Sequence, residues 1–319
     1  MDKFSNILFV AEWVPGNSAA FAQAMVLAKN NQAKLTVLGA VDLLMVPGPT
    51  SYGPVEDLHD VKLAAQWDNL RELRKVAGDT SHCEFKVVAG RRFVEIIREV
   101  LVEKRDLVVK AIGLTHGGQS LFGSTDMKLL RQCPCPLWLI KSTELKDERQ
   151  ILAAVDYDPN DDAEDAMNRR ILDVATSLAL SEFAELHVVH AWRLAYEKTL
   201  RSGRTRYSGA EIDAMAEEVE NHRNLWLQKL VDDHCERLGR ELRDYLKPQT
   251  HLIKGRADHV VPALSEKLGA ELLVMGTVGR VGVPGLFIGN TAETILRQIN
   301  CSVLAVKPAG FVSPITLHQ

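Results

Sequence analysis

The feature that most constrains the fold is an internal repeat. Residues 106–122 (DLVVKAIGLTHGGQSLF) can be laid on residues 271–287 (ELLVMGTVGRVGVPGLF), and Cys135 then falls on Cys301 when one residue is inserted. The repeat length of about 165 residues is too long for the unit of a solenoid. The sequence therefore predicts a duplicated domain rather than a chain of small repeats.

Length and composition agree with this division. A chain of 319 residues suggests two domains, and its 46% hydrophobic and 25% charged residues are those of an ordinary soluble globular protein. We place the boundary in the polar stretch at residues 142–150, so that the domains span residues 1–145 and 146–319. The net charge of −4 gives no reason to expect nucleic acid or an anionic membrane as a partner.

Within each half, short apolar runs alternate with helical patterns. In the first half we expect strands at residues 6–10, 34–40, 83–89, 106–110 and 136–140. In the second half we expect them at residues 151–155, 185–191, 250–254, 271–275 and 302–306. Strands joined by crossover helices predict an α/β fold, with a right-handed, mostly parallel, doubly wound sheet in each half. In such sheets a ligand binds beyond the carboxyl ends of the strands, where the winding reverses.

One stretch near the C-terminus has the pattern of a phosphate site. The apolar strand at 271–275 is followed by glycines at positions 276, 279, 282, 285 and 289, and helical spacing begins after Asn290. Glycine lets the backbone approach an anion closely, and the free N–H groups at a helix start attract it. The spacing matches neither a P-loop, because no Gly-Lys-Ser/Thr follows, nor the dinucleotide motif Gly-x-Gly-x-x-Gly.

The spacing Gly276-x2-Gly279-x9-Gly289, followed by Asn290 and Thr291, resembles the signature of the nucleotide-binding branch of the universal stress protein family. The resemblance covers essentially the whole chain and is closest to the tandem members of that family. It implies two five-stranded sheets with strand order 3-2-1-4-5, a role in the stress response, and ATP as the cofactor, with Mg²⁺ left open.

The resemblance also implies which residues hold the nucleotide. Asp156, at the carboxyl end of the first strand of the second half, would accept hydrogen bonds from the adenine amino group or the ribose hydroxyls. Its alternative role is to cap the turn at residues 158–162. Backbone atoms near Val189 would line the base pocket, and Arg280 would add a cation or remain an exposed solvated residue. The expected cofactor-binding residues are Asp156, Val189, Met275, Gly276, Gly279, Arg280, Gly289, Asn290 and Thr291.

The first half departs from this signature. Ala111 and Leu114 stand at the places of the first two glycines, Glu12 at the place of the aspartate and Lys110 at the place of the methionine. We therefore expect no ATP in this half. We hypothesise that Glu12 and Lys110 pair across the vacated site, because one charge without its partner would be costly there. The alternative is that Lys110 extends to solvent; a separation of more than about 6 Å would exclude the pair.

The acidic run at residues 156–165 (DYDPNDDAED) has two rival interpretations, and both fail. A nucleophile of the haloacid-dehalogenase type would need a Gly-Thr/Val continuation that is missing. An EF-hand would need glycine where Asp161 stands and glutamate where Met167 stands. We expect residues 160–162 to cap the helix that begins near Ala163, since acids suit the positive end of a helix.

Cysteines and histidines give weaker signals. The five cysteines form neither a disulfide framework nor a paired zinc motif. The sequence Cys133-Pro-Cys135-Pro suggests redox or metal chemistry, but buried packing explains it better, because Cys135 and Cys301 precede equivalent apolar strands. No histidine pair has metal-ligand spacing beside a carboxylate. The basic segment at 193–209 is a solvated loop by default, with a lid or a partner surface as alternatives.

These patterns favour a nucleotide-binding regulatory module over an enzyme, because hydrolysis would need a positioned base and metal ligands that the sequence does not show. The alternatives are an interaction protein that binds no nucleotide and a slow Mg²⁺-dependent ATPase. We expect an adenine nucleotide and an unknown protein as partners, without nucleic acid or membrane. As in dimers of the family, the two final strands, at 136–140 and 302–306, would pair antiparallel to form a pseudo-dimer within the chain, with a homodimer left open.

The location expected from the sequence is cytoplasmic. The apolar run at residues 6–11 is too short for the core of a signal peptide. No apolar run reaches the length of a transmembrane helix.

Overall fold

The computed structural model describes residues 4–14, 16–43, 53–78, 83–113, 122–141, 149–158, 162–203, 205–277 and 288–317. The chain divides into two compact units, which are described separately. The N-terminal unit takes its described residues from Lys3–Lys146, Thr277–Gly289 and Asn300–Gln319. The C-terminal unit takes them from Asp147–Gly276 and Asn290–Ile299. The expected domain boundary at 145/146 stays a prediction, and the last strand of the chain lies in the N-terminal unit.

The sheet of the N-terminal unit contains β1 (Asn6–Ala11), β2 (Lys34–Asp42), β3 (Cys83–Gly90), β4 (Leu107–Ile112), β5 (Leu137–Lys141) and β10 (Ser302–Val306). Their order is β3-β2-β1-β4-β5-β10. The first five are parallel, whereas β10 runs antiparallel to β5, with Val303 opposite Leu139. The first half thus has the predicted order 3-2-1-4-5, and the predicted antiparallel pairing of the two final strands is confirmed.

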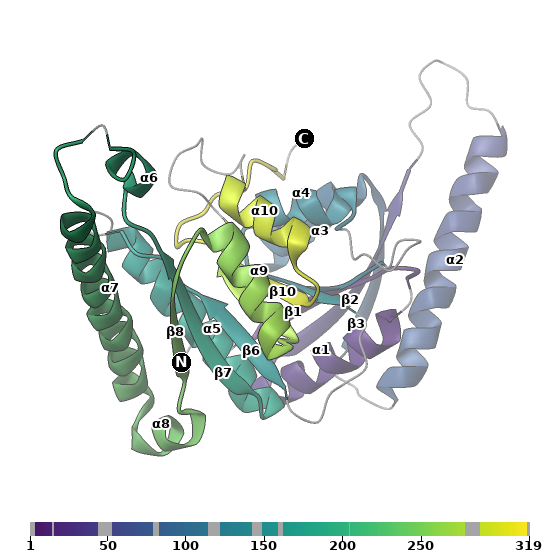
Figure 1. Cartoon of the computed structure of the whole chain (residues 1–319). Helices are drawn as coiled ribbons and strands as arrows, with labels where there is room; N and C mark the ends of the chain where they lie inside the picture. The colour runs from purple at the N-terminus through teal and green to yellow at the C-terminus, as the bar shows by residue number, and fades with distance from the viewer. Residues whose placement is uncertain are drawn as a thin grey trace. The chain divides into compact units, whose positions relative to one another are not determined.

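Helices cover both faces of this sheet. They are α1 (Asn17–Asn31), α2 (Gly53–Ala77), α3 (Arg92–Glu103) and α4 (Ser124–Gln132). Helix α1 contacts α2, and α3 contacts α4, as right-handed crossovers require when the winding reverses between β3 and β4 (Figure 1). Because both faces are covered, β1 and β4 are apolar along almost their whole length and are buried. The lysine in β4 is therefore an exception that needs a partner.

The sheet of the C-terminal unit contains β6 (Gln150–Ala154), β7 (Glu185–Trp192), β8 (Gln249–Lys254) and β9 (Leu272–Gly276). Their order is β9-β6-β7-β8, and all the pairs between them are parallel. This is the order predicted for the first four strands of the second half. The α/β fold with a doubly wound parallel sheet is confirmed.

The helices of this unit are α5 (Asp162–Glu182), α6 (Glu197–Leu200), α7 (Gly209–Leu238), α8 (Arg240–Leu246), α9 (Ala257–Leu268) and α10 (Asn290–Gln298). Helix α5 packs with α7, and α9 packs with α10 (Figure 1). The apolar residues that recur at helical spacing along α5 are all buried: Ile171, Val174, Ala175 and Leu178. The segment expected to be a loop at 193–209 includes the short helix α6.

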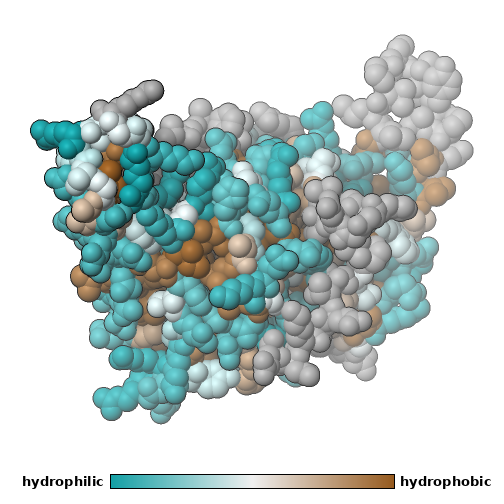
Figure 2. Space-filling view, viewed as in Figure 1, coloured by the Kyte–Doolittle hydropathy of each residue, from teal (hydrophilic) through white to brown (hydrophobic). Residues whose placement is uncertain are grey.

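Helix α7 has clear N-terminal and C-terminal capping signals in its sequence. Ser208 Oγ accepts from the N–H of Glu211, and Glu211 Oε2 accepts from the N–H of Ser208, which together form a capping box. The helix ends at Gly239, whose φ of 88° favours glycine. Figure 2 shows hydrophobic residues gathered between α7 and α9, where β8 lies with half-exposed side chains along most of its length.

Among the residues that the structure describes, no helix combines the length and the apolar character needed to cross a membrane.

Candidate functional site

Three parallel strands of the C-terminal unit bring the predicted nucleotide-binding residues to one edge of the sheet. Ala154, the last residue of β6, lies opposite Val189 of β7 on one side and Met275 of β9 on the other. Asp156 follows two residues after Ala154, and Gly276 directly follows Met275. Because the carboxyl ends of parallel strands lie at the same edge, these positions share the place where doubly wound sheets bind ligands.

Two of these residues present no side chain to a ligand. Val189 is 1% exposed and Met275 is 4% exposed, so both side chains belong to the core. The carbonyl oxygen of Val189 accepts a 3.0 Å hydrogen bond from the N–H of Val155. The expectation that this part of the pocket acts through backbone atoms is consistent with that burial.

The backbone of Asp156 is held by a side chain that sequence reasoning missed. Asn168 of α5 is fully buried; its Oδ1 accepts from the N–H of Asp156 at 3.0 Å, and its Nδ2 donates to the carbonyl of Asp156 at 2.6 Å. Asp156 itself is exposed, and its Oδ1 accepts from the N–H of Tyr157 at 2.9 Å. The nucleotide role of this carboxylate stays a prediction, as does its alternative role in the turn at residues 158–162, part of which lies outside the described residues.

The N-terminal unit contains a related contact with different spacing. Asn17 of α1 accepts from the N–H of Glu12 at 3.4 Å, and the two residues are five positions apart. In the C-terminal unit the corresponding separation between Asp156 and Asn168 is twelve positions. Because the spacing differs, aligning the two halves of the sequence could not reveal the shared contact.

Gly276 is not required by packing. A Cβ atom added to it would meet Met167 Cγ at 3.6 Å, Met167 Sδ at 3.7 Å and Ile171 Cδ1 at 3.9 Å, which are ordinary van der Waals contacts. Its counterpart in the N-terminal unit, Ala111, carries a Cβ in a buried strand. Within the described part of the chain, neither packing nor backbone conformation therefore explains why this position is glycine.

The rest of the glycine-rich segment is described only at its ends. Gly279 and Arg280 lie outside the described residues. The N–H of Gly289 donates to the carbonyl of Thr277 at 3.0 Å, so this donor is used within the protein. Asn290 and Thr291 are exposed in the first turn of α10, where backbone N–H groups lack partners from the helix itself.

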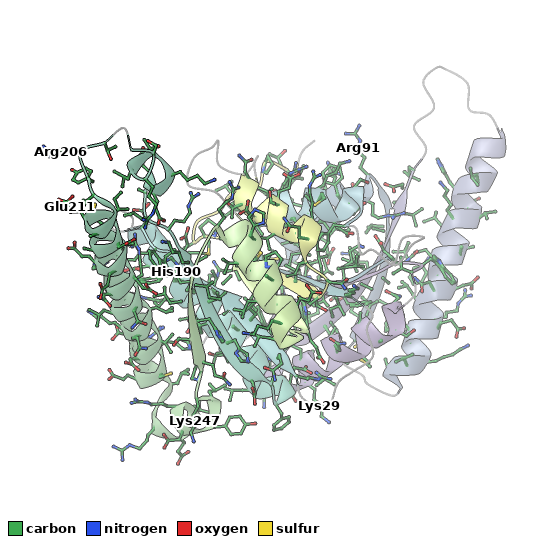
Figure 3. The ribbon with its side chains drawn as sticks, viewed as in Figure 1. Lys29, Arg91, His190, Arg206, Glu211 and Lys247 are labelled. Carbon is green, nitrogen blue, oxygen red and sulfur yellow. The ribbon has the colours of Figure 1, made fainter. Side chains whose placement is uncertain are left out.

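An aromatic cluster lies beside Asp156. The ring of Tyr157 meets Trp226 edge-on at 5.0 Å, and the guanidinium of Arg223 lies 3.7 Å from the Tyr157 ring centroid. His190 also meets Trp226, at 5.0 Å, and its Nδ1 lies 3.3 Å from the carbonyl oxygen of Val155. Figure 3 shows His190 between α7 and the sheet of the C-terminal unit. In the sequence, Trp226 is one of the apolar residues that recur at helical spacing in α7.

A groove of about 610 Å³ lies between α5 and α7. His234, one of its lining residues, is 1% exposed; its Nε2 lies 2.8 Å from Thr176 Oγ1 and its Nδ1 3.2 Å from Arg237 Nη2. Burial, and then the charge of Arg237, lower the pKa of His234 to about 4. Since arginine can only donate, Nδ1 is the acceptor and the neutral imidazole donates from Nε2 to Thr176.

The matching edge of the N-terminal unit holds charges instead of glycine. Lys110 Nζ lies 2.9 Å from Glu12 Oε2 and 2.8 Å from Asp126 Oδ1, and it donates to the carbonyl of Ala111 at 3.1 Å. The hypothesised pair between Glu12 and Lys110 is confirmed, and the alternative in which Lys110 extends to solvent is wrong, because this side chain is 3% exposed. Asp126, from the first turn of α4, is a partner that the sequence did not suggest.

The charges of this cluster balance one another. Burial alone would lower the pKa of Lys110, but the carboxylates of Asp126 and Glu12 outweigh it, so the pKa is raised. Arg92 Nη1 lies 3.5 Å from Glu12 Oε1 and adds a second cation at the more exposed side. The side chains therefore fill the position at which the C-terminal unit has bare glycine backbone.

Comparison with known proteins now decides the family. The model of the Universal stress protein family matches twice, at residues 3–141 and 148–307. The chain belongs to the universal stress protein family. Universal stress protein E of Escherichia coli (strain K12) is 30% identical over 244 residues, which cover 74% of this chain and 72% of that protein. The Universal stress protein E homolog of Haemophilus influenzae is 26% identical over 321 residues, covering 96% of this chain and 98% of the homolog.

Solved structures of the family support the tandem arrangement. A functionally unknown protein from Pseudomonas aeruginosa PAO1 is 25% identical, with a TM-score of 0.66, and the match covers 96% of this chain and 93% of that one. A universal stress protein from Archaeoglobus fulgidus is 19% identical, with a TM-score of 0.59 over 95% of this chain and 98% of that one, and shows the shared fold alone. The family, the duplication and the fold expected from the sequence are confirmed.

Proposed function

We propose that the C-terminal unit binds ATP at the carboxyl edge of β6, β7 and β9, that the N-terminal unit does not bind it, and that the protein acts as a regulatory module of the stress response. The observation that carries this proposal is Gly276. Packing would accept an alanine there, at contacts no shorter than 3.6 Å, so the absence of a side chain serves something other than the fold. Close approach of a phosphate to the backbone is a physical reason for it.

Each group of the site then has a role. Gly276 and Gly279 admit the phosphates, while Asn290 and Thr291 offer donors at the positive end of α10. Asp156, with its backbone held by Asn168, accepts from the adenine or the ribose. The same chemistry is unsuited to the N-terminal unit, because Lys110 and its two carboxylate partners occupy the corresponding edge.

The proposal is tested by a substitution that leaves the fold unchanged. Gly276→Ala should fold with the stability of the parent, because the added Cβ meets ordinary contacts. We nevertheless expect it to weaken ATP binding at least tenfold in titration calorimetry, because a side chain at this strand end hinders the close approach of a phosphate to the backbone. The matched control is Gly123→Ala in the N-terminal unit, whose Cβ would lie 3.4 Å from Asp126 Oδ2 and which should leave ATP affinity unchanged.

Ligand-linked stability gives an independent measurement. ATP at 100 times its Kd should raise the free energy of unfolding by about 2.7 kcal/mol. No stabilisation at millimolar ATP, or equal affinity in Gly276→Ala, would instead favour an interaction protein that binds no nucleotide. Release of phosphate that requires Mg²⁺ and is lost in Gly279→Leu would favour the slow ATPase.

A further inference from the structure

The two cysteines on either side of Pro134 lie close enough to react with each other. Cys133 caps the C-terminus of α4 and Cys135 lies just before β5, and their Sγ atoms are 3.6 Å apart. A disulfide needs an S–S distance of about 2.05 Å, so the sulfurs would have to approach by roughly 1.5 Å. Because only one residue separates the two cysteines, the second sulfur stays close to the first after the first has been oxidised.

A buried cation lies near this pair. Lys307, the first residue after β10, is 1% exposed, and its Nζ donates to the carbonyl of Leu130 and, at 3.0 Å, to Thr277 Oγ1. Burial lowers the pKa of Lys307 to about 8, with the two thiols opposing that effect. At neutral pH the amine is therefore still mostly an ammonium ion.

The two thiols are chemically unequal. The hydrogen bond with Cys135 lowers the pKa of Cys133; burial opposes this, and the charge of Lys307 adds to the lowering. The same hydrogen bond, together with burial, raises the pKa of Cys135 well above its usual value. Cys133 is fully buried and Cys135 is 7% exposed, so only a small oxidant can reach the pair. The thiolate is the nucleophilic form of cysteine, which assigns the first step to Cys133.

We propose that Cys133 and Cys135 form a reversible dithiol–disulfide pair that responds to hydroperoxides, with Lys307 as the positioning residue that stabilises the thiolate. With hydrogen peroxide, the Cys133 thiolate attacks one oxygen, the O–O bond breaks, and the leaving hydroxide takes a proton to become water; an organic hydroperoxide would release an alcohol instead. Cys135 then attacks the sulfenic sulfur as its own proton goes to the departing hydroxyl, which leaves as a second water. Two thiols lose two electrons and one hydroperoxide is reduced; an added dithiol reverses the change.

The test uses the full chain and a single peptide. Trypsin releases residues 132–141 (QCPCPLWLIK) with both cysteines. After treatment with hydrogen peroxide, unfolding and alkylation, this peptide should be lighter than the reduced peptide by about 2 Da and carry no alkyl group. Dithiothreitol should restore two alkylation sites. The buried Cys235 and Cys301 serve as internal references and should remain open to alkylation.

Variants separate the roles. Cys135→Ser should accumulate a sulfenic acid that dimedone traps on Cys133, whereas Cys133→Ser should leave Cys135 a thiol. Lys307→Met should slow disulfide formation at pH 7 about tenfold and move its pH profile upward by about one unit, since tenfold less thiolate corresponds to that change. The matched control is Lys141→Met, the counterpart of Lys307 in the repeat, which should keep the parent rate; its tryptic peptide then spans residues 132–146.

The outcomes are decisive. The proposal is overturned if the peptide at 132–141 still takes two alkyl groups after peroxide, or if it gains oxygen without losing 2 Da. Should Lys307→Met fail to fold, the unaltered chain and the two serine variants still decide the question. None of these readouts depends on ATP, so failure here leaves the proposed nucleotide site untouched.

Discussion

Replacing Lys110 by methionine is the sharpest test of how the N-terminal unit compensates for its lost glycines. The change keeps an unbranched chain of similar length but removes the ammonium that faces Glu12 at 2.9 Å and Asp126 at 2.8 Å. Two carboxylates, 14% and 4% exposed, then face each other without a cation between them. We expect this variant to be strongly destabilised at neutral pH.

The magnitude follows from the geometry. At an effective dielectric constant of 20, each contact is worth about 6 kcal/mol of direct attraction, most of which is offset by desolvation of the three groups. Breaking a buried pair by removing one partner costs about 3–5 kcal/mol. Glu12 retains some contact with water and with Arg92, which places the expected loss near the lower end.

The assay is urea unfolding followed by circular dichroism, with the first transition analysed. A loss of about 3–4 kcal/mol, with a slope near 2 kcal/mol per molar urea, lowers the midpoint by roughly 1.5–2 M. Lys110→Met combined with Glu12→Gln and Asp126→Asn should recover most of the stability.

A surface pair provides the control. Lys75 lies 2.6 Å from Glu72, with side chains 72% and 64% exposed, so Lys75→Met should change stability by less than about 1 kcal/mol. If Lys110→Met costs no more stability than this control, the ammonium does not balance the two carboxylates.

Two further predictions concern the C-terminal unit. The pKa of His234 falls from its usual 6.5 to about 4, so its contribution to stability is complete above pH 6.5 and disappears as the pH falls to 4, with an upper limit of about 3 kcal/mol. The variant His234→Gln can still donate to Thr176. Its urea midpoint should therefore depend less on pH across this range than the midpoint of the parent. An unchanged acid limb would show that another group controls it. Asn168→Ala removes both hydrogen bonds to the backbone of Asp156, so it should lower the free energy of unfolding by about 1–3 kcal/mol and weaken ATP binding. Asn17→Ala loses one 3.4 Å contact; it should cost less stability and leave ATP affinity unchanged.

The fold was predictable because strands buried on both faces leave a clear record in the sequence. The apolar runs that became β1, β4 and β6 lie within one or two residues of their expected positions, and the repeat fixed how many times the pattern occurs. The pairing of Glu12 with Lys110 could be inferred because both replace residues at matching strand ends. This inference needs only topology, which places the carboxyl ends of neighbouring strands together.

Contacts from helices could not be inferred in the same way. Asp126 reaches Lys110 from the first turn of α4, and Asn168 reaches Asp156 from the second turn of α5. Which helical residue faces a strand end depends on where the helix begins and on how the helix lies on the sheet. Both would have to be known to within about one residue. Loops of different length in the two halves change both quantities, so the repeat gives no guide to these partners.

The antiparallel contact between β5 and β10 has a consequence for how the protein can be divided. Strand β10 (residues 302–306) completes the sheet that also contains β1 (residues 6–11), so segments far apart in the sequence contribute to the same sheet. A fragment cut after Lys146 would present β5 with a row of unsatisfied N–H and C=O groups. Such a fragment would pair along β5 with a second copy of itself, so its measured stability would be that of a dimer rather than of the native N-terminal unit.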